Sequence, residues 1–220
     1  MSTVLVTGAA RGIGLELVRA FANRGDDVIA VCRQPSEDLE DLDVRVEGGV
    51  DVSHEEAVAA LTRRLDGIPI DVLVNNAGIL LPDELESLDL DTVTQQMEVN
   101  ALGPLRVTQH LLGNLEKGSK VALVTSRMGS IADNGSGRMY GYRMSKAALN
   151  AAGMSLARDL APRGIAVILL HPGYVATDMT SHGGDVSPAD AAAGLIARID
   201  ELTLDSTGSF RHANGETLPW

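Results

Sequence analysis

The chain has 220 residues, 45% hydrophobic and 22% charged, which suits one soluble globular domain with a sizeable core. Its formal net charge of −12 argues against nucleic acid and anionic membrane surfaces as partners, because both attract basic patches. The single cysteine, Cys32, excludes an intramolecular disulfide framework and a cysteine-based metal site. Since no leader pattern and no run of about 20 apolar residues occurs, we expect a cytoplasmic protein without a membrane span.

Short β-branched runs alternate with helical patterns along the whole chain. In chain order we expect a strand at Thr3–Thr7, a helix at Gly12–Asn23, strands at Val28–Cys32 and within Val44–Val52, a helix at Glu55–Leu65, a strand at Asp71–Asn75, a helix from Leu90 to Leu115 broken near Gly103-Pro104, a strand at Lys120–Thr125, a helix at Tyr140–Ala161, a strand at Ile165–Leu170, a helix at Pro188–Ile199 and a strand near Gly208–His212.

The expected strands are nearly continuous apolar runs, which is typical of strands buried on both faces of a parallel sheet. Their alternation with helices predicts a doubly wound α/β fold with about seven mostly parallel strands and helices on both faces. No linker, repeat or low-complexity segment divides the chain, so we expect a single domain over residues 1–220. Ligands of such sheets bind beyond the carboxyl ends of the strands.

The first strand runs into a glycine-rich loop, Thr7-Gly8-Ala9-Ala10-Arg11-Gly12-Ile13-Gly14. Glycines allow a sharp turn and a close approach to a pyrophosphate, and the helix that follows offers free N–H groups. Taken alone, the G-x-x-x-G-x-G spacing also fits a simple tight turn. We expect it to bind a dinucleotide through Gly8, Arg11, Gly12, Ile13 and Gly14.

The second strand ends in Arg33, and no acidic residue stands there to bind a ribose 2′-hydroxyl. Arg33 can bind a 2′-phosphate, with Arg11 as a second charge, so NADP(H) is favoured over NAD(H). The alternative is that both are surface arginines. Asp51 follows the third strand, either as an acceptor for the adenine amino group or as a turn residue. Asn76-Ala77-Gly78 follows the fourth strand and is expected beside the cofactor.

Tyr142 and Lys146 lie four residues apart, on one face of the expected Tyr140–Ala161 helix. A nearby ammonium lowers the pKa of a phenol, so Tyr142 is a candidate acid/base for a carbonyl or alcohol oxygen. Ser126 ends the fifth strand, where its hydroxyl can bind the same oxygen. Ser130 is a competitor, but Ser126 is preferred because it sits directly at the strand end.

These motifs, in this order, resemble the short-chain dehydrogenase/reductase family over nearly the whole chain. The residues that carry the resemblance are Thr7–Gly14, Asn75-Asn76-Ala77-Gly78, Asn100, Ser126, Tyr142 with Lys146, and Pro172-Gly173-Tyr174-Val175-Ala176-Thr177-Asp178. Met139–Arg143 and the ending Gly215–Trp220 look most like the C-factor-like or sniffer-type carbonyl reductases. The resemblance implies a Rossmann fold and NADPH-dependent reduction of an aldehyde, ketone or quinone.

The resemblance also implies roles for individual residues. Asn100 would hold a water in a proton relay, Ser126 would position the substrate, Tyr142 would be the acid/base, and Lys146 would bind the nicotinamide ribose and lower the tyrosine pKa. Asn76 would lie beside the adenosine and Thr177 at the carboxamide. Cofactor contacts are also expected from Asp51, Ala77, Gly78, Pro172, Gly173 and Val175. The resemblance further implies a homodimer or homotetramer whose subunits contact one another through the long helices.

Two departures from the family and two alternatives remain. The gap from Ser126 to Tyr142 is longer than usual, and the segment Met179–Val186 is short where many members carry a helical lid, which indicates an open pocket. One alternative is a weakly catalytic or non-catalytic NADP(H)-binding signalling protein. The other is a sugar-nucleotide epimerase or dehydratase, for which the C-terminal part is short. The five histidines do not cluster at ligand spacing, so no metal is expected.

Overall fold

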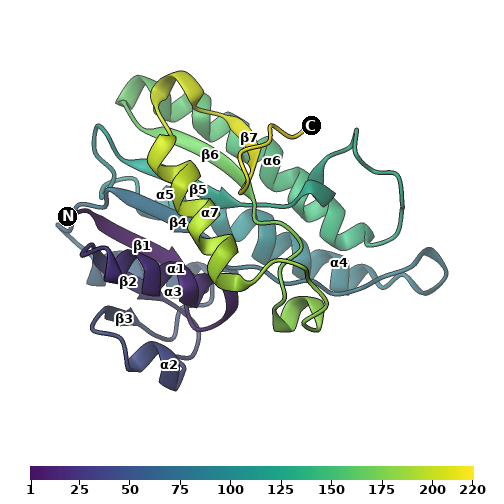
Figure 1. The fold of residues 1–220 in the computed structure, drawn as a ribbon, viewed down its shortest axis with the longest axis horizontal. Coiled ribbons are helices and arrows are strands. Elements are labelled where there is room, and N and C mark those ends of the chain that lie inside the picture. The colour runs from purple at the N-terminus through teal and green to yellow at the C-terminus, as the bar shows by residue number, and fades with distance from the viewer.

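All seven strands of the computed structural model, which describes residues 1–220, run parallel in one sheet with the order β3-β2-β1-β4-β5-β6-β7 (Figure 1). The strands are β1 (Thr3–Thr7), β2 (Asp27–Val31), β3 (Arg45–Glu47), β4 (Val72–Asn75), β5 (Lys120–Val124), β6 (Ala166–His171) and β7 (Ser209–His212). The expected doubly wound α/β fold is therefore confirmed, with strand boundaries close to the predicted ones. β3 is the exception, because only three residues of the predicted Val44–Val52 region pair with β2.

Helices cover both faces of the sheet. They are α1 (Gly12–Asn23), α2 (Glu37–Glu40), α3 (Glu55–Arg64), α4 (Leu90–Met97), α5 (Gly103–His110), α6 (Tyr140–Leu160) and α7 (Pro188–Glu201). On one face α1 packs against α7, and in Figure 1 both cross in front of the strands. On the other face α5 packs against α3 and α6. No helix is long and apolar enough to cross a bilayer.

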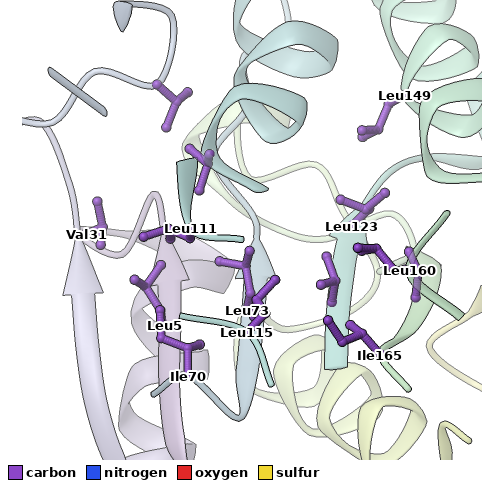
Figure 2. Packing of buried hydrophobic residues seen from close by; sticks show 14 of the residues in the cluster. Leu5, Val31, Ile70, Leu73, Leu111, Leu115, Leu123, Leu149, Leu160 and Ile165 are labelled. Carbon is purple, nitrogen blue, oxygen red and sulfur yellow. The ribbon is translucent and has the colours of Figure 1, made fainter. Parts of the chain in front are cut away.

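Alternate residues of each strand enter two separate hydrophobic clusters, as side chains on a pleated sheet must. Leu5 points into the cluster under α3, α5 and α6, whereas its neighbours Val4 and Val6 join the cluster under α1 and α7. Figure 2 shows the first cluster, with Leu5, Leu73 and Leu123 on adjacent strands. Two buried faces explain why the strands read as continuous apolar runs.

The helix predicted from Leu90 to Leu115 breaks earlier than expected. One π-helical turn, Glu98–Leu102, separates α4 from α5, and Gly103-Pro104 instead begins α5. The backbone stays helical from the π turn into α5, so Pro104, which has no N–H to donate, lies where the hydrogen-bond pattern of the helix changes. The π turn contains Asn100, whose side chain is fully buried. π turns of this kind often mark functional sites.

The strand order reverses beside β1, whose neighbours are β2 and β4. At such a switch point the loops that follow the strands separate and leave a crevice for a ligand. The loops after β1 to β6 carry most of the predicted site residues, and the first turn of α1, the π turn and the first two turns of α6 carry the others. The fold therefore brings these residues to one edge of the sheet.

Candidate active site

The glycine loop after β1 is locked against the loop after β4. Thr7 Oγ1 accepts hydrogen bonds from the N–H groups of Asn76 and Ala77 at 3.0 and 3.1 Å. The Asn76 amide donates to the carbonyls of Thr7 and Gly8 at 3.0 and 3.3 Å. A Cβ on Gly14 would lie 2.1 Å from the carbonyl oxygen of Gly8, so only glycine fits there.

The amino terminus of α1 is suited to an anion. Its N-cap residue, Arg11, is extended and makes no side-chain cap, so the first N–H groups of α1 have no side-chain partner. Gly8 and Gly12 adopt positive φ values of 68° and 55°, which shape the loop in front of these groups. Ile13 follows within the first turn. A pyrophosphate is the kind of group that such a terminus binds.

Arg33 and Arg11 face different carboxylates. Arg33, which follows β2, lies 3.9 Å from Asp51 and its side chain is 67% exposed. Arg11 instead pairs with Asp178 at 3.1 Å, beyond the end of β6. Arg33 is thus available at the end of β2, while Arg11 links the glycine loop to the segment after β6.

Asp51 is held as a turn residue. Its carboxylate accepts hydrogen bonds from the backbone N–H and the hydroxyl of Ser53, at 2.9 and 2.6 Å. Burial alone would raise the pKa of Asp51, but the Ser53 hydrogen bonds and the charges of His54 and Arg33 lower it overall. The position of Asp51 after β3 is compatible with both predicted roles, as a turn residue and as an acceptor for the adenine amino group.

Ser126 rather than Ser130 reaches Tyr142. Ser126 is the second residue after β5, and its hydroxyl accepts from the Met128 N–H at 3.1 Å and is close enough to Tyr142 to lower the pKa of the phenol. Ser130 accepts from the Asp133 N–H at 3.1 Å and orders its own loop. The geometry therefore favours the serine that the sequence argument preferred.

Lys146 lies one turn beyond Tyr142 on α6. Its ammonium is 5.8 Å from the centroid of the Tyr142 ring and donates to the Val124 carbonyl at 2.9 Å. A Cβ on Gly78 would lie 3.7 Å from this ammonium and 3.2 Å from Asn100 Oδ1. The loop after β4, the π turn and α6 therefore converge on one point.

The electrostatics differ from the expectation in one respect. Burial raises the pKa of Tyr142, and the hydrogen bond with Ser126 offsets this only in part. Burial also lowers the pKa of Lys146 to about 8. Within the protein chain alone, burial therefore keeps the pKa of Tyr142 above its ordinary value, and the expected lowering of this pKa by Lys146 does not occur.

Asn100 organises the loop after β4. Its amide accepts from the Ile79 N–H and donates to the Ile79 carbonyl, both at 2.8 Å. The same amide donates to Ser145 Oγ on α6 at 3.0 Å. The side chain of Asn100 thus ties α6 to the loop, a contact that the sequence did not reveal.

The segment after β6 closes the other side of the site. Pro172 and Gly173 leave the strand, with Gly173 at a φ of 98°, and Val175 is buried. Thr177 lies against the glycine loop, since its Cγ2 would be 3.3 Å from a Cβ on Gly12. Residues 176–185 contain one 3₁₀ turn, Asp178–Thr180, and no longer helix, and the Ala176 N–H donates to the Val186 carbonyl at 2.9 Å.

Three arginines near the catalytic segment are already engaged. Arg127 pairs with Asp133 and Glu216, both at 2.9 Å, and Arg138 pairs with Glu84 at 3.4 Å. The Arg143 side chain donates to three backbone carbonyls and a serine hydroxyl of the loop before α6. These arginines order the loops around the site.

Sequence reasoning missed Asp83 and Gln96. Both are buried polar residues that bind backbone groups of other segments around the site. No local pattern marks either residue, and only the packing of α4 against α6 brings them to the site. A polar residue just after Pro82 reads as an ordinary loop position.

Comparison with known proteins gives matches over most of the chain. The sequence pattern of the family described as short chain dehydrogenase matches residues 2–185. The 1-hydroxy-2-glutathionyl-2-methyl-3-butene dehydrogenase of Rhodococcus sp. (strain AD45) is 46% identical over 226 residues, covering 100% of both chains. C-signal of Myxococcus xanthus is 45% identical over 155 residues, which cover 69% of this chain and 93% of that protein.

Solved structures agree in fold over the whole chain. The carbonyl reductase Sniffer of D. melanogaster superposes with a TM-score of 0.94 at 29% identity, covering 100% of both chains. The NADPH-bound carbonyl reductase from chicken fatty liver superposes with a TM-score of 0.90 at 27% identity, covering 100% of this chain and 99% of that one. Sniffer and C-signal are the types of protein that the sequence motifs resembled.

Proposed function

Since the chain belongs to the short-chain dehydrogenase/reductase family, we propose that it is an oxidoreductase that uses NADPH to reduce a carbonyl group to an alcohol, with Tyr142 as the acid/base. One observation carries this proposal. Three different parts of the chain meet beside the loop after β4, which is locked against the glycine loop: the segment after β5 with Ser126, the π turn with Asn100, and α6 with Tyr142 and Lys146. Chance packing of a surface tyrosine and lysine would not bury both side chains next to a strand-end serine.

The residues present fit a dinucleotide. The glycine loop leaves no room for side chains and presents the uncapped terminus of α1, so Gly8, Gly12, Ile13 and Gly14 would hold the pyrophosphate. Arg33 would meet a 2′-phosphate, and Asp51, Asn76, Ala77 and Gly78 would line the adenosine side. Pro172, Gly173, Val175 and Thr177 would border the nicotinamide, together with Tyr142 and Lys146. When bound, the nicotinamide supplies or accepts the hydride.

Tyr142 would deliver the proton. Its raised pKa keeps the hydroxyl protonated near neutral pH, which suits a group that donates a proton to a carbonyl oxygen during reduction. Ser126 would orient the same oxygen through its hydroxyl. Lys146 and Asn100 would hold the neighbouring backbone in place. Through a water molecule they would also return a proton to the Tyr142 hydroxyl after it has donated its own.

A second candidate is oxidation in the opposite direction. The Rhodococcus relative is named a dehydrogenase of a glutathionyl alcohol, so alcohols with a thioether-linked glutathione belong among the substrates to test. The C-signal relative favours a third candidate, an NADP(H)-binding signalling protein. The complete set of Ser126, Tyr142 and Lys146 supports catalysis over binding alone.

The test is product analysis with labelled cofactor. The protein is incubated with NADPH deuterated at C4, on either face, and with a panel of aldehydes, ketones and quinones. For aldehydes and ketones the proposal expects alcohol that carries deuterium at the carbinol carbon from one face only, and for quinones it expects hydroquinone. For all of them it expects faster turnover with NADPH than with NADH. Oxidation of alcohols with NADP⁺ but no carbonyl reduction would favour the second candidate. Tight cofactor binding without turnover of any carbonyl or alcohol would favour the third.

A further inference from the structure

We propose that Asp83 is a positioning residue for Tyr142, acting through the first turn of α6. This inference rests on the proposed function, because it matters for catalysis only if Tyr142 is the acid/base. Asp83 lies in the loop after β4, 59 residues before Tyr142 in the sequence, and its side chain is buried. It touches neither the Tyr142 hydroxyl nor any residue of the glycine loop in the observed contacts.

The amino terminus of α6 has no cap of its own. Its N-cap residue is Met139, which has no side-chain oxygen to accept from the free N–H groups of the first turn. Three residues in succession before the helix, Gly137, Arg138 and Met139, adopt positive φ values of 65°, 56° and 54°. Two of them are not glycine, so an outside contact must hold this turn in place.

Asp83 supplies the missing acceptors. Its carboxylate accepts from the N–H of Tyr140 through Oδ1 and from the N–H of Gly141 through Oδ2, the latter at 2.9 Å. Its backbone carbonyl also accepts from the Met139 N–H at 3.1 Å. A Cβ on Gly141 would lie 3.2 Å from Oδ2, so the absence of a side chain there permits the approach. A carboxylate at this end also complements the helix dipole.

The loop that carries Asp83 is itself held at every second residue. The Gln96 amide accepts from the Leu81 N–H at 3.0 Å and donates to the Leu81 carbonyl at 3.1 Å. Asn100, four residues later, binds both backbone groups of Ile79 in the same way. The side-chain amides of Gln96 and Asn100 therefore hold the backbone before Asp83 in place. The Asp83 carboxylate in turn holds the first turn of α6 in place.

Tyr142 depends on this arrangement because it is the third residue of α6. First turns fray when their N–H groups lack partners, and Tyr142 must keep its hydroxyl at Ser126, which is on a different element. Small displacements of a reacting group lower turnover strongly. Asp83 is thus expected to control kcat without contact to substrate or cofactor.

The test compares Asp83→Asn with the wild type. An asparagine keeps one acceptor and turns a donor toward the second N–H, so one of the two bonds is lost. We expect kcat for the best carbonyl substrate to fall about 10- to 100-fold, while the Kd for NADPH changes less than twofold. Hydrogen exchange of residues 140–143 is expected to rise at least tenfold. Ser187→Ala, which removes the cap of α7, is the matched control and is expected to change neither kcat nor exchange in α6.

Each outcome decides the inference. Unchanged kcat and unchanged exchange in Asp83→Asn would overturn it, and so would an equal loss of kcat in Ser187→Ala. If Asp83→Asn does not fold, Asp83→Ser retains one acceptor oxygen, whose own O–H can rotate away from the two N–H groups, and the same split between kcat and Kd is expected in weaker form. A wild type that turns over no carbonyl or alcohol refutes the proposed function, while the exchange measurement still shows whether Asp83 holds the first turn of α6.

Discussion

The amine of Lys146 is buried. It donates a hydrogen bond to the Val124 carbonyl and lies 5.8 Å from the centroid of the Tyr142 ring. Burial lowers its pKa from 10.5 to about 8. The folded state therefore disfavours the charged amine, which the unfolded chain accommodates in water. The buried amine therefore lowers the stability of the folded protein, since an apolar side chain at this place would avoid the cost of burying a charge.

The pH dependence of stability follows from this shift. Because the folded pKa lies below the unfolded one, the destabilisation is full below pH 8 and disappears as the pH rises toward 10.5. The unfolding free energy of the wild type, relative to that of Lys146→Met, should rise by about 3 kcal/mol across this window. Urea unfolding at several pH values measures it, with the exposed Lys117→Met as control. A difference that stays flat with pH would show that the buried amine is not the cause.

Arg33 is the residue that we expect to cause a preference for NADPH over NADH. Replacing it with serine should raise the Kd for NADPH about 10- to 100-fold, because a charge-assisted contact with the 2′-phosphate is lost. The Kd for NADH should change little, and fluorescence titration measures both. Arg11→Ser is expected to have the smaller effect, because Arg11 already pairs with Asp178. Equal loss of NADPH and NADH affinity in Arg33→Ser would contradict this role.

At the scale of elements, the site depends on segments that are joined by hydrogen bonds of short side chains, most of them to backbone groups. Hydrogen bonds between Thr7 and Asn76 join the glycine loop after β1 to the loop after β4. The hydrogen bond from the Asn100 amide to Ser145 joins the π turn to α6. None of these contacts uses a long side chain. The arrangement is therefore sensitive to single added atoms.

Gly14→Ala tests this sensitivity. The new methyl group would meet the Gly8 carbonyl, so the β1–α1 loop must move away from the loop after β4. We expect a loss of about 3 kcal/mol in unfolding free energy and at least a tenfold rise in the Kd for NADPH. Gly113→Ala is the control, because the space around Gly113 is open. If both variants bind NADPH as the wild type does, close backbone approach is not what the loop requires.

For the molecule as a whole, the sequence predicted the architecture because each strand and helix carries its own local signal. The continuous apolar strands and the amphipathic helices need no knowledge of the tertiary structure. The glycine loop, Ser126 and the Tyr142–Lys146 pair were predictable for the same reason, since strand ends and helical spacing place them. The resemblance added Asn100.

What the sequence did not predict depends on contacts between distant segments. The π turn arises where α4 and α5 pack on α6, and the clamps by Gln96 and Asp83 join residues 15 and 57 positions apart. The pKa of Tyr142 depends on the balance between burial and the effect of the Ser126 hydroxyl, which spacing alone does not give. Local patterns therefore identified the candidate site residues, while the contacts between these residues and the pKa of Tyr142 required the fold.

The most direct test of the central claim is Tyr142→Phe. Phenylalanine fills nearly the same buried volume and removes only the hydroxyl. The account predicts that kcat for NADPH-dependent carbonyl reduction falls about 10³-fold or more, while the Kd for NADPH stays within twofold of the wild type. A variant that binds NADPH normally and retains a tenth or more of wild-type turnover would contradict the account, because another group would then supply the proton.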